Sequence, residues 1–419
     1  MLRRLTNPIV IAMVVGIVVG AICHNQLDPA AAKQVASYFS IITDVFIRLI
    51  RMIIGPLVFS TLVVGIAHMG DASSLGRIGA RTLAWFIGAS LVSLFLGLIM
   101  VNLLAPGQNL GLPLPDATTP AAVQGASLNL REFITHLVPR SFFESMVNNE
   151  ILQIVVFSAF VGVAAMNQGH HGKVIADLAN SAANIMLQIT GYVMKAAPLA
   201  IFAALSSVVT TQGLDILTAY GRFMGGFYLS LILLWALLIG AGYLIVGGSI
   251  GKLFNGLKAP ILLAFSTASS EAAYPKTLEQ LERFGVSKRV ASFVLPVGYS
   301  FNLDGSMMYC TFAVMFIAQA YNIEVTWAHQ ITMLLLLMIT SKGMAGVPRA
   351  SLVVIAATLT TFNLPEAGLL LILGVDQFLD MGRSATNVVG NAVATTAVAK
   401  WENELHPEAV PDTEQAQTT

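Results

Sequence analysis

Long apolar stretches recur along almost the whole of this chain, and they constrain its fold more than any other feature. A helix that crosses a membrane needs roughly 20 apolar residues. Stretches of that kind lie at about residues 8–27, 41–70, 79–105, 149–168, 182–211 and 217–249. The composition agrees, because only 11% of the 419 residues are charged, whereas soluble domains carry about 25%. The sequence therefore predicts an all-α membrane protein.

The charge balance and the cysteines exclude several classes of function. Basic and acidic residues number 22 each, so the chain lacks the basic excess of a nucleic-acid-binding protein. Cys23 and Cys310 form no disulfide framework, and neither they nor the histidines show the spacing of a metal site. We therefore expect no nucleic-acid partner, no resident metal and no cofactor.

The N-terminal apolar stretch is expected to be a first transmembrane helix. A signal peptide, or a lipoprotein signal cleaved before Cys23, is the alternative, but the stretch is long for one and many further spans follow. Arg3 and Arg4 precede this helix, and Arg77 and Arg81 follow the second span. Because positive residues favour the cytoplasmic side, we expect the N-terminus in the cytoplasm.

Two apolar segments in the second half of the chain are interrupted near their middle. The segments 252–288 and 329–363 each become polar at the centre, so neither is expected to cross the bilayer in one pass. Irregular backbone at membrane depth is tolerated only where protein or a hydrated cavity surrounds it. Paired broken segments indicate a transporter binding site. The sequence therefore predicts two re-entrant helical hairpins whose tips meet inside the protein.

A row of polar residues marks the last long helix, 366–402. Within "DQFLDMGRSATNVVGN" the polar side chains are spaced 4, 3, 1, 3 and 4 residues apart, which places them on one face of a helix. These residues are Asp376, Asp380, Arg383, Ser384, Asn387 and Asn391. Charges at membrane depth are costly, so we expect them to face a cavity or a partner. A structural Asp380–Arg383 ion pair that joins helices is the alternative to a binding site.

The first hairpin carries the motif "FSTASSEAAYP". Ser269 and Ser270 offer hydroxyl and backbone groups at its tip. Glu271 is a carboxyl group in apolar surroundings, where it can bind and release protons near neutral pH. The alternative is a buried neutral carboxyl that a backbone hydrogen bond holds and that has no part in coupling.

The motif "SFNLDGS", residues 300–306, interrupts the apolar segment 289–321. Asn and Asp compete with a helix for its backbone hydrogen bonds, so Asn302, Asp304 and Gly305 predict local unwinding. Carbonyl groups freed beside Asp304 would form an oxygen-lined site for a monovalent cation. A helix that is only kinked is the alternative, because Gly and Pro are common in membrane helices.

The tip of the second hairpin, "SKGMAGVPRAS", combines Gly343, Gly346 and Pro348. Small residues let the backbone approach a ligand closely, and exposed N–H groups near a helix N-terminus suit a carboxylate. A tip of this composition also suits a lid that opens. A plain buried turn is the alternative.

Four motifs in this order, "STASSEAAYP", "NLDGS", "KGMAGVP" and "DMGRSATNVVGN", resemble the glutamate transporter family, the dicarboxylate/amino acid:cation symporters. The similarity covers about residues 5–402. It implies eight transmembrane helices and two re-entrant hairpins in this family's elevator fold, assembled as a homotrimer in the lipid of a bacterial inner membrane with both termini cytoplasmic. It also implies a scaffold of residues 1–77 and 107–214, a transport domain of 78–106 and 215–402, and a disordered cytoplasmic tail, 403–419.

The resemblance also implies roles for single residues. Arg383 would pair with the side-chain carboxylate of an acidic amino acid, and Asp380 would bind its α-amino group. The chemistry agrees, because a guanidinium offers a carboxylate a planar pair of donors. Main-chain groups of the two hairpins would hold the α-carboxylate. The further substrate contacts would come from Ser384, Asn387, Ser269, Ser270, Gly346 and Val347.

Several positions depart from the sodium-coupled members of that family. Asn391 stands where those members carry Asp as a cation ligand, and Cys310 stands where some members have Glu or Gln. Met344 replaces a small hydroxyl residue, and Lys342 lies two positions before it. Sodium prefers oxygen ligands and is repelled by a nearby positive charge. The pattern therefore resembles the proton-coupled bacterial branch of the family.

The sequence thus predicts a symporter, not an enzyme, that imports L-glutamate and/or L-aspartate with protons. Glu271 is the expected proton carrier, with Asp376 and Asp304 as alternatives. Sodium is an alternative co-transported ion, in a site formed by Asn302, Asp304, Asn387 and Asn391. A proton-coupled C4-dicarboxylate symporter is a rival function, although Asp380 would repel a second carboxylate. An intramembrane serine hydrolase acting through Ser270 and a channel are further rivals.

Overall fold

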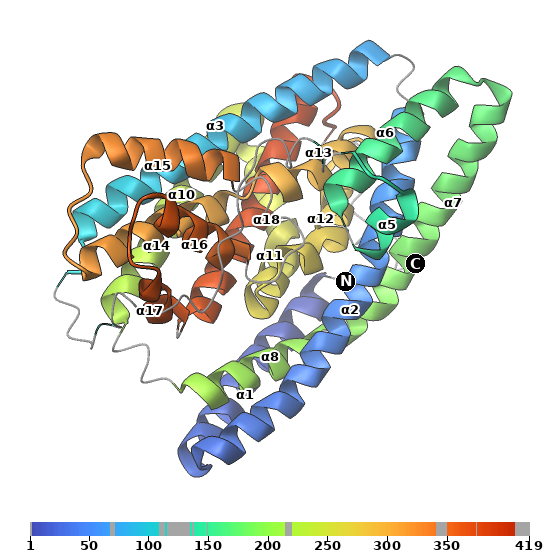
Figure 1. The fold of residues 1–419 in the computed structure, drawn as a ribbon. Helices are drawn as coiled ribbons and strands as arrows, with labels where there is room; N and C mark the ends of the chain where they lie inside the picture. The colour runs from blue at the N-terminus through green and yellow to red at the C-terminus, as the bar shows by residue number, and fades with distance from the viewer. Residues whose placement is uncertain are drawn as a thin grey trace.

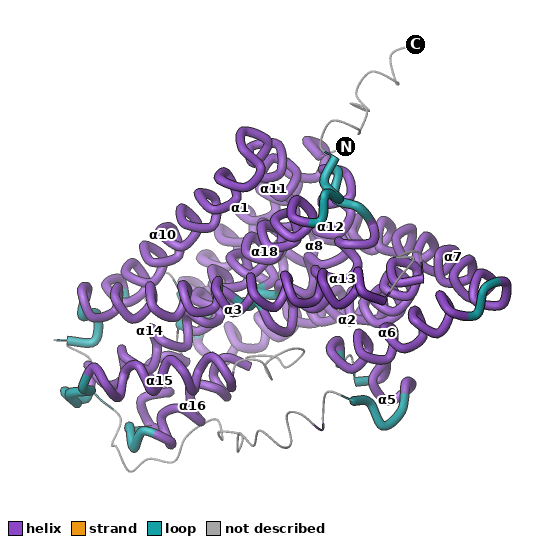
Figure 2. Tube along the Cα trace, turned by 90° about the horizontal axis from the view of Figure 1, so that it is seen from above, coloured by secondary structure: helices purple, strands orange, loops and turns teal. Residues whose placement is uncertain are grey.

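The computed structural model describes residues 2–67, 72–108, 114, 135, 138–148, 150–213, 220–340, 350–373 and 375–406. Regular structure in these residues is helical (Figure 2), apart from one isolated β-bridge between Val286 and Leu405. The prediction of an all-α protein is therefore confirmed.

Long apolar helices dominate the described chain. Within it, five helical stretches are long and apolar enough to cross a membrane: Pro29–Ala67, Gly76–Leu104, His170–Gln212, Gly221–Thr267 and Lys288–Ala320. Shorter apolar helices cover Ile11–Gln26, Gln153–Asn167, Trp327–Met338 and Ser351–Thr361. These positions agree with a protein that crosses a membrane several times, while the count of eight spans and two hairpins stays a prediction.

Most helices from the first half of the chain pack side by side (Figure 1). They are α1 (Leu2–Gln26), α2 (Pro29–Ala67), α5 (Phe142–Val147), α6 (Ile151–Asn167), α7 (His170–Val193), the 3-10 turn η1 (Met194–Ala196) and α8 (Ala197–Gln212). Helix α2 contacts α6, α7 and α8, while α1 lies along α8. Glycines permit the second contact, because a Cβ on Gly16 or Gly20 of α1 would collide with α8.

Helix α3 (Ala72–Leu104) packs with the helices of the second half. These are α10 (Gly221–Val246), η2 (Gly247–Ser249), α11 (Ile250–Thr267), α12 (Ser270–Phe284), α13 (Lys288–Phe301), α14 (Asp304–Ala320), α15 (Trp327–Thr340), α16 (Ala350–Thr361), η4 (Glu366–Gly368), α17 (Leu369–Leu373) and α18 (Asp376–Trp401). Helix α18 lies among them and contacts α3, α10, α11, α12, α13 and α14, so most of its residues are buried. The division into a scaffold and a transport domain concerns relative movement and stays a prediction.

Two breaks bring irregular backbone toward α18. Helices α11 and α12 form a hairpin that turns at Ala268, in the left-handed conformation with φ 51°. The Ser269 hydroxyl then caps α12 by accepting a hydrogen bond from the Ala272 amide at 3.3 Å. Helices α13 and α14 are separated at Asn302 and Leu303, whose ψ angles of 64° and 61° are not helical.

Two apolar clusters meet along α18. One joins α2, α6 and α8 to α11, α12 and α13, and includes Val398 of α18. The other joins α3 and α10 to α14 and the helices after it, and includes Val389 and Val393 of α18. The polar face of α18 is thus enclosed by two hydrophobic cores, which exclude lipid and bulk water from most of it.

Candidate functional site

The polar row of α18 lies inside the protein. Its members Asp376, Asp380, Ser384, Asn387 and Asn391 are buried, and the side chain of Arg383 is 13% exposed. Buried charges are tolerated only with partners of opposite charge or with hydrogen bonds. Each charge in the row therefore depends on groups within the protein.

Arg383 and Asp380 form an ion pair within α18. Arg383 Nη2 lies 2.7 Å from Asp380 Oδ1, and the Asp380 side chain is 10% exposed. Ser384 donates its hydroxyl to the same carboxylate oxygen at 3.2 Å. Both residues belong to α18, so the ion pair itself lies within one helix. Arg383 Nε has no hydrogen-bond partner among the described residues, so the guanidinium keeps one donor for another group.

Ser306 of α14 links the row to the broken helix. Its hydroxyl accepts hydrogen bonds from Arg383 Nη1 at 2.8 Å and from Asn387 Nδ2 at 3.1 Å. Asn387 Oδ1 in turn accepts from the amides of Gly305 and Ser306 at 2.9 and 3.3 Å. These amides belong to the first turn of α14, where N–H groups have no partner within their own helix. Asn387 therefore caps the helix that begins after the break.

Gly305 has a different role from the predicted one. The backbone is interrupted at Asn302 and Leu303, and Gly305 already belongs to α14. A Cβ at this position would collide with the backbone of Arg383. The glycine is required for the close approach of α14 to α18, and the unwinding occurs before it.

Asn302, Asp304 and Asn391 form a second polar cluster with Ser93 of α3. Asn302 Nδ2 donates to Asp304 Oδ2 at 3.1 Å and to Asn391 Oδ1 at 3.3 Å, and Ser93 donates to Asp304 Oδ1 at 3.3 Å. All four side chains are buried. Asn302 Oδ1 and Asn391 Nδ2 have no hydrogen-bond partner in the part of the chain that is described. Buried polar atoms of this kind require water or a ligand, and the unpaired oxygen suits a cation.

Asp376 binds Tyr309 of α14. The tyrosine hydroxyl donates to Asp376 Oδ1 at 2.7 Å, and both side chains are buried. Tyr309 follows Ser306 by about one helical turn. One face of α14 therefore contacts two charged members of the row, Arg383 through Ser306 and Asp376 through Tyr309.

The first hairpin places its tip beside the same part of α18. Ala264 and Ala273, which lie about one turn to either side of the tip, pack against Val388. Residues 269–271 are half-buried, so protein does not seal the tip. Glu271 lies in the first turn of α12, where the helix dipole favours a carboxylate. The substrate contacts of Ser269 and Ser270 and the proton-coupling role of Glu271 stay predictions.

The tip of the second hairpin, 341–349, lies outside the described residues. Its two arms are described: α15 and α16 contact each other, α15 contacts α3, and α16 contacts α14. The substrate contacts expected at Gly346 and Val347, and the effects on sodium expected from Lys342 and Met344, therefore stay predictions.

The sequence matches known proteins over nearly its whole length. Residues 5–401 match the model of the sodium:dicarboxylate symporter family. The chain belongs to this family. A proton/sodium-glutamate symport protein of Geobacillus stearothermophilus is 38% identical over 407 residues, which are 96% of this chain and 95% of the relative. A C4-dicarboxylate transport protein of Pseudomonas savastanoi pv. phaseolicola is 39% identical over 408 residues, 96% of this chain and 87% of the relative.

Membership of the sodium:dicarboxylate symporter family confirms the resemblance drawn from the four motifs and identifies the chain as a multi-pass membrane transporter.

Three residues at the centre of this symporter were not predicted as site residues: Ser306, Tyr309 and Ser93. Ser306 ends the "SFNLDGS" motif and Tyr309 follows at helical spacing, so their shared face was visible in the sequence. Ser93 is one of several hydroxyl residues in an apolar helix and carries no such signal.

Proposed function

We propose that this symporter imports L-glutamate and/or L-aspartate together with protons. The observation that carries the proposal is the Asp380–Arg383 pair, a carboxylate and a guanidinium 2.7 Å apart and shielded from solvent. An acidic amino acid can exchange partners with this pair: its side-chain carboxylate binds Arg383, and its ammonium binds Asp380. The charges of the pair thus match opposite charges on the substrate.

Further substrate contacts come from α18 and from the two hairpins. Ser384 and Asn387 present side chains that already bond to Asp380 and Ser306. Main-chain groups around residues 269–270 and 346–347 hold the α-carboxylate. Since all of these groups bind rather than react, we propose no catalytic activity, including at the serines of the first hairpin.

Protons are the proposed coupling ions. Asn391 supplies an amide, and not a carboxylate, to the polar cluster beside Asn302. Cys310 is buried with its thiol 3.9 Å from the Ser351 carbonyl, so this position offers no carboxylate either. Both features lower the negative charge that a sodium ion would require.

Glu271 is the proposed proton carrier, because it lies half-buried at the tip that packs on α18. Asp376 and Asp304 are the alternatives, each already bonded to a hydroxyl donor. A sodium ion held by Asn302, Asp304, Asn387 and Asn391 is the alternative to a proton, and the unpaired Asn302 Oδ1 supports it.

In the proposed cycle, residues 78–106 and 215–402 carry the substrate across a bacterial inner membrane against a scaffold of residues 1–77 and 107–214, within a homotrimer. Both termini lie in the cytoplasm. Basic residues support this orientation, because several occur near the start of α3, the turn between α12 and α13, and the end of α18. They are Arg77, Arg81, Arg283, Lys288, Arg289 and Lys400.

Reconstitution in liposomes tests the proposal. Labelled glutamate or aspartate is offered to purified protein under an inward proton gradient without sodium, and separately under an inward sodium gradient at constant pH, with the membrane potential clamped. We expect accumulation in the first condition and none in the second. Uptake that requires sodium and is indifferent to pH would overturn the proton coupling, while uptake of neither amino acid would overturn the substrate assignment.

A proton-coupled C4-dicarboxylate symporter is the second candidate. A relative with that name is 39% identical to this chain, as similar as the glutamate symporter at 38%. A dicarboxylate has no ammonium, however, and its second carboxylate would meet Asp380, which repels it. Succinate that displaces labelled glutamate at lower concentration than aspartate does, in the same liposomes, would favour this candidate.

A further inference from the structure

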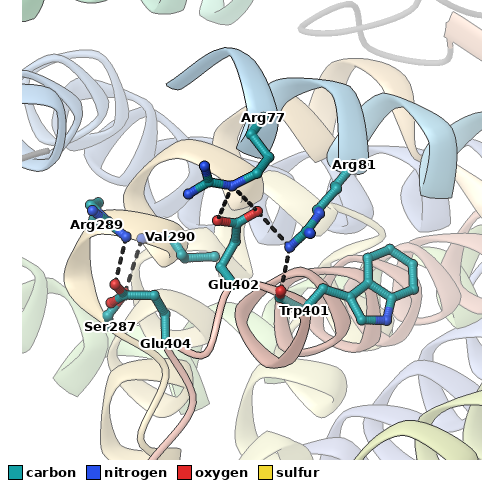
Figure 3. Close-up of polar contacts among 8 residues, drawn as sticks. All are labelled: Arg77, Arg81, Ser287, Arg289, Val290, Trp401, Glu402 and Glu404. Atoms are coloured by element: carbon teal, nitrogen blue, oxygen red, sulfur yellow. Dashed lines mark hydrogen bonds and ion pairs between the residues drawn. The ribbon is translucent and has the colours of Figure 1, made fainter. Parts of the chain in front are cut away.

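The chain doubles back at the end of α18 and binds two other parts of the structure (Figure 3). Asn403 adopts the left-handed conformation, with φ 57°, and the Glu404 amide closes the turn by donating to the Ala399 carbonyl at 2.8 Å. We call residues 401–406 the C-terminal clasp. The sequence predicts a disordered tail over 403–419; residues 403–406 contact the rest of the protein through backbone hydrogen bonds and a β-bridge.

Glu402 of the clasp binds the start of α3. Its carboxylate oxygens lie 3.0 Å from Arg77 Nε and 2.8 Å from Arg81 Nη1, and Arg81 also donates to the Trp401 carbonyl. The Glu402 side chain is only 1% exposed, although those of Arg77 and Arg81 are 50% and 37% exposed. Most surface ion pairs contribute little, but a carboxylate buried against two guanidinium groups depends on both of them. The contact is therefore more than a solvated surface pair.

Residues 404–406 of the clasp bind the turn between α12 and α13. The backbone contacts are the β-bridge of Leu405 with Val286, a hydrogen bond from the Ser287 amide to the Glu404 carbonyl at 3.0 Å, and one from the His406 amide to the Gly285 carbonyl at 2.9 Å. Glu404 Oε1 also lies 2.5 Å from Arg289 Nη2 of α13. Backbone contacts and a side-chain ion pair thus both hold the clasp to this turn.

The elements that the clasp joins are the ones that build the site. Helix α3 carries Ser93, which binds Asp304, while α12 begins at the hairpin tip. Helix α13 leads to the break at Asn302, and α18 carries Arg383.

The clasp lies far from the proposed substrate contacts. Trp401, with which it begins, is the last residue of α18. Trp401 and Arg383 are 18 positions apart on this helix, a distance of about 27 Å at a rise of about 1.5 Å per residue. We therefore expect a change in the clasp to leave the groups around Arg383 and Asp380 in place.

We propose that Glu402, Arg77 and Arg81 are positioning residues, which hold the start of α3 to the end of α18, while residues 404–406 hold the α12–α13 turn, so that the parts of the site keep their register while the substrate is carried. The inference rests on the proposed transport cycle, with Arg77 moving as part of the continuous helix α3 although it is the last residue of the proposed scaffold range 1–77. Because the clasp is remote from Arg383 and Asp380, breaking it is expected to slow carriage and to leave substrate binding unchanged.

Glu402→Gln tests this inference, since it keeps the shape of the side chain and removes its charge. With the full chain in liposomes, we expect the maximal uptake rate to fall about tenfold with KM within about twofold of wild type, because a loss confined to the rate marks an interaction that substrate binding does not use. Glu402→Asp keeps the charge and should recover most of the rate. Lys400→Gln is the matched control, because Lys400 is exposed and forms no ion pair among the described residues.

Hydrogen exchange measured by mass spectrometry gives a readout that needs no substrate. In Glu402→Gln the amides of residues 76–82, which lie at the two arginines that Glu402 binds, should exchange faster, while those of α14 should not change. Exchange and uptake equal to wild type would overturn the inference, and so would a raised KM at an unchanged maximal rate. If the wild type carries no acidic amino acid, the proposed function fails, but the exchange result still decides whether the clasp holds these elements. If Glu402→Gln does not fold, Arg77→Gln should show the same changes to a smaller degree.

Discussion

Replacing Asp380 by serine is the most direct test of the substrate assignment. Asp380 lies 2.7 Å from Arg383, and Ser384 donates to the same carboxylate oxygen at 3.2 Å. Serine keeps a hydroxyl group at this position and removes the negative charge. The variant therefore retains the guanidinium for carboxylates and loses the partner proposed for the substrate's ammonium.

The size of the effect follows from the strength of charged hydrogen bonds. A hydrogen bond to a charged group contributes about 1.5–3 kcal/mol, and about 1.4 kcal/mol changes an affinity tenfold. Affinity for glutamate or aspartate should therefore fall about 10- to 150-fold. The protein should also lose stability, because removing one partner of a buried ion pair costs about 3–5 kcal/mol. The side chains are 10% and 13% exposed, which places the expected loss at the lower end of that range.

Calorimetric titration and thermal unfolding measure the two effects separately. We expect weaker binding of both amino acids, a lower Tm without ligand, and a larger rise of Tm with succinate than in the wild type, since succinate supplies a carboxylate to the unpaired Arg383. Ser384→Ala is the comparison variant: it removes one hydroxyl donor to the Asp380 carboxylate but keeps its charge, and should weaken binding by only about 2- to 10-fold. Unchanged amino acid affinity in a folded Asp380→Ser variant would refute the pairing of Asp380 with the ammonium.

Three further substitutions test the proton coupling at Glu271, the packing around Gly390 and the burial of the Glu282 carboxyl group. Glu271→Gln should abolish accumulation driven by a proton gradient in liposomes and spare exchange of internal for external substrate; proton-driven uptake that persists would rule out Glu271 as the carrier. Gly390→Ala should destabilise the protein by about 1–3 kcal/mol, because a Cβ there would overlap the Asp304 carboxylate, whereas Gly240→Ala, with open space around it, should leave thermal unfolding unchanged. Burial raises the pKa of Glu282 at the end of α12, so this group lowers stability as pH rises from the unfolded-state pKa through the folded-state pKa. Glu282→Gln should therefore have a higher Tm than wild type at about pH 8, with the gap closing below the unfolded-state pKa of about 4.3; a gap equal at both pH values would contradict this.

The helices and their breaks were predictable because apolar length and polar interruption act locally. The segments 252–288 and 329–363 correspond to the pairs α11–α12 and α15–α16. A break within "SFNLDGS" was also predicted, but it falls at Asn302 and Leu303 and not at Gly305. The sequence shows a glycine without showing whether a turn or a close contact requires it, and here the contact with the Arg383 backbone does.

The partners of the polar residues were not predictable, because they depend on the register of helices that are distant in sequence. Ser306 and Tyr309 face α18 only through the packing of α14 against it. Glu402 meets Arg77 and Arg81 across 325 and 321 residues. In the sequence the arginines indicated topology, and Glu402 was assigned to the last helix, 366–402, so nothing paired them.

The charges of the site give a physical reason for coupling. Asp376 and Asp380 lie on α18 with Arg383, while Asp304 and Glu271 lie in the first turns of α14 and α12, which pack against α18. An acidic amino acid adds one net negative charge, and two like charges about 7 Å apart repel by about 2 kcal/mol at an effective dielectric constant of about 20. In the proposed complex the ammonium binds Asp380 and the side-chain carboxylate binds Arg383, so the second carboxylate of the substrate adds a negative charge to a site that already holds Asp304, Asp376 and Glu271. A proton or cation that binds with the substrate would remove that repulsion, which gives a physical reason for the coupling that we propose.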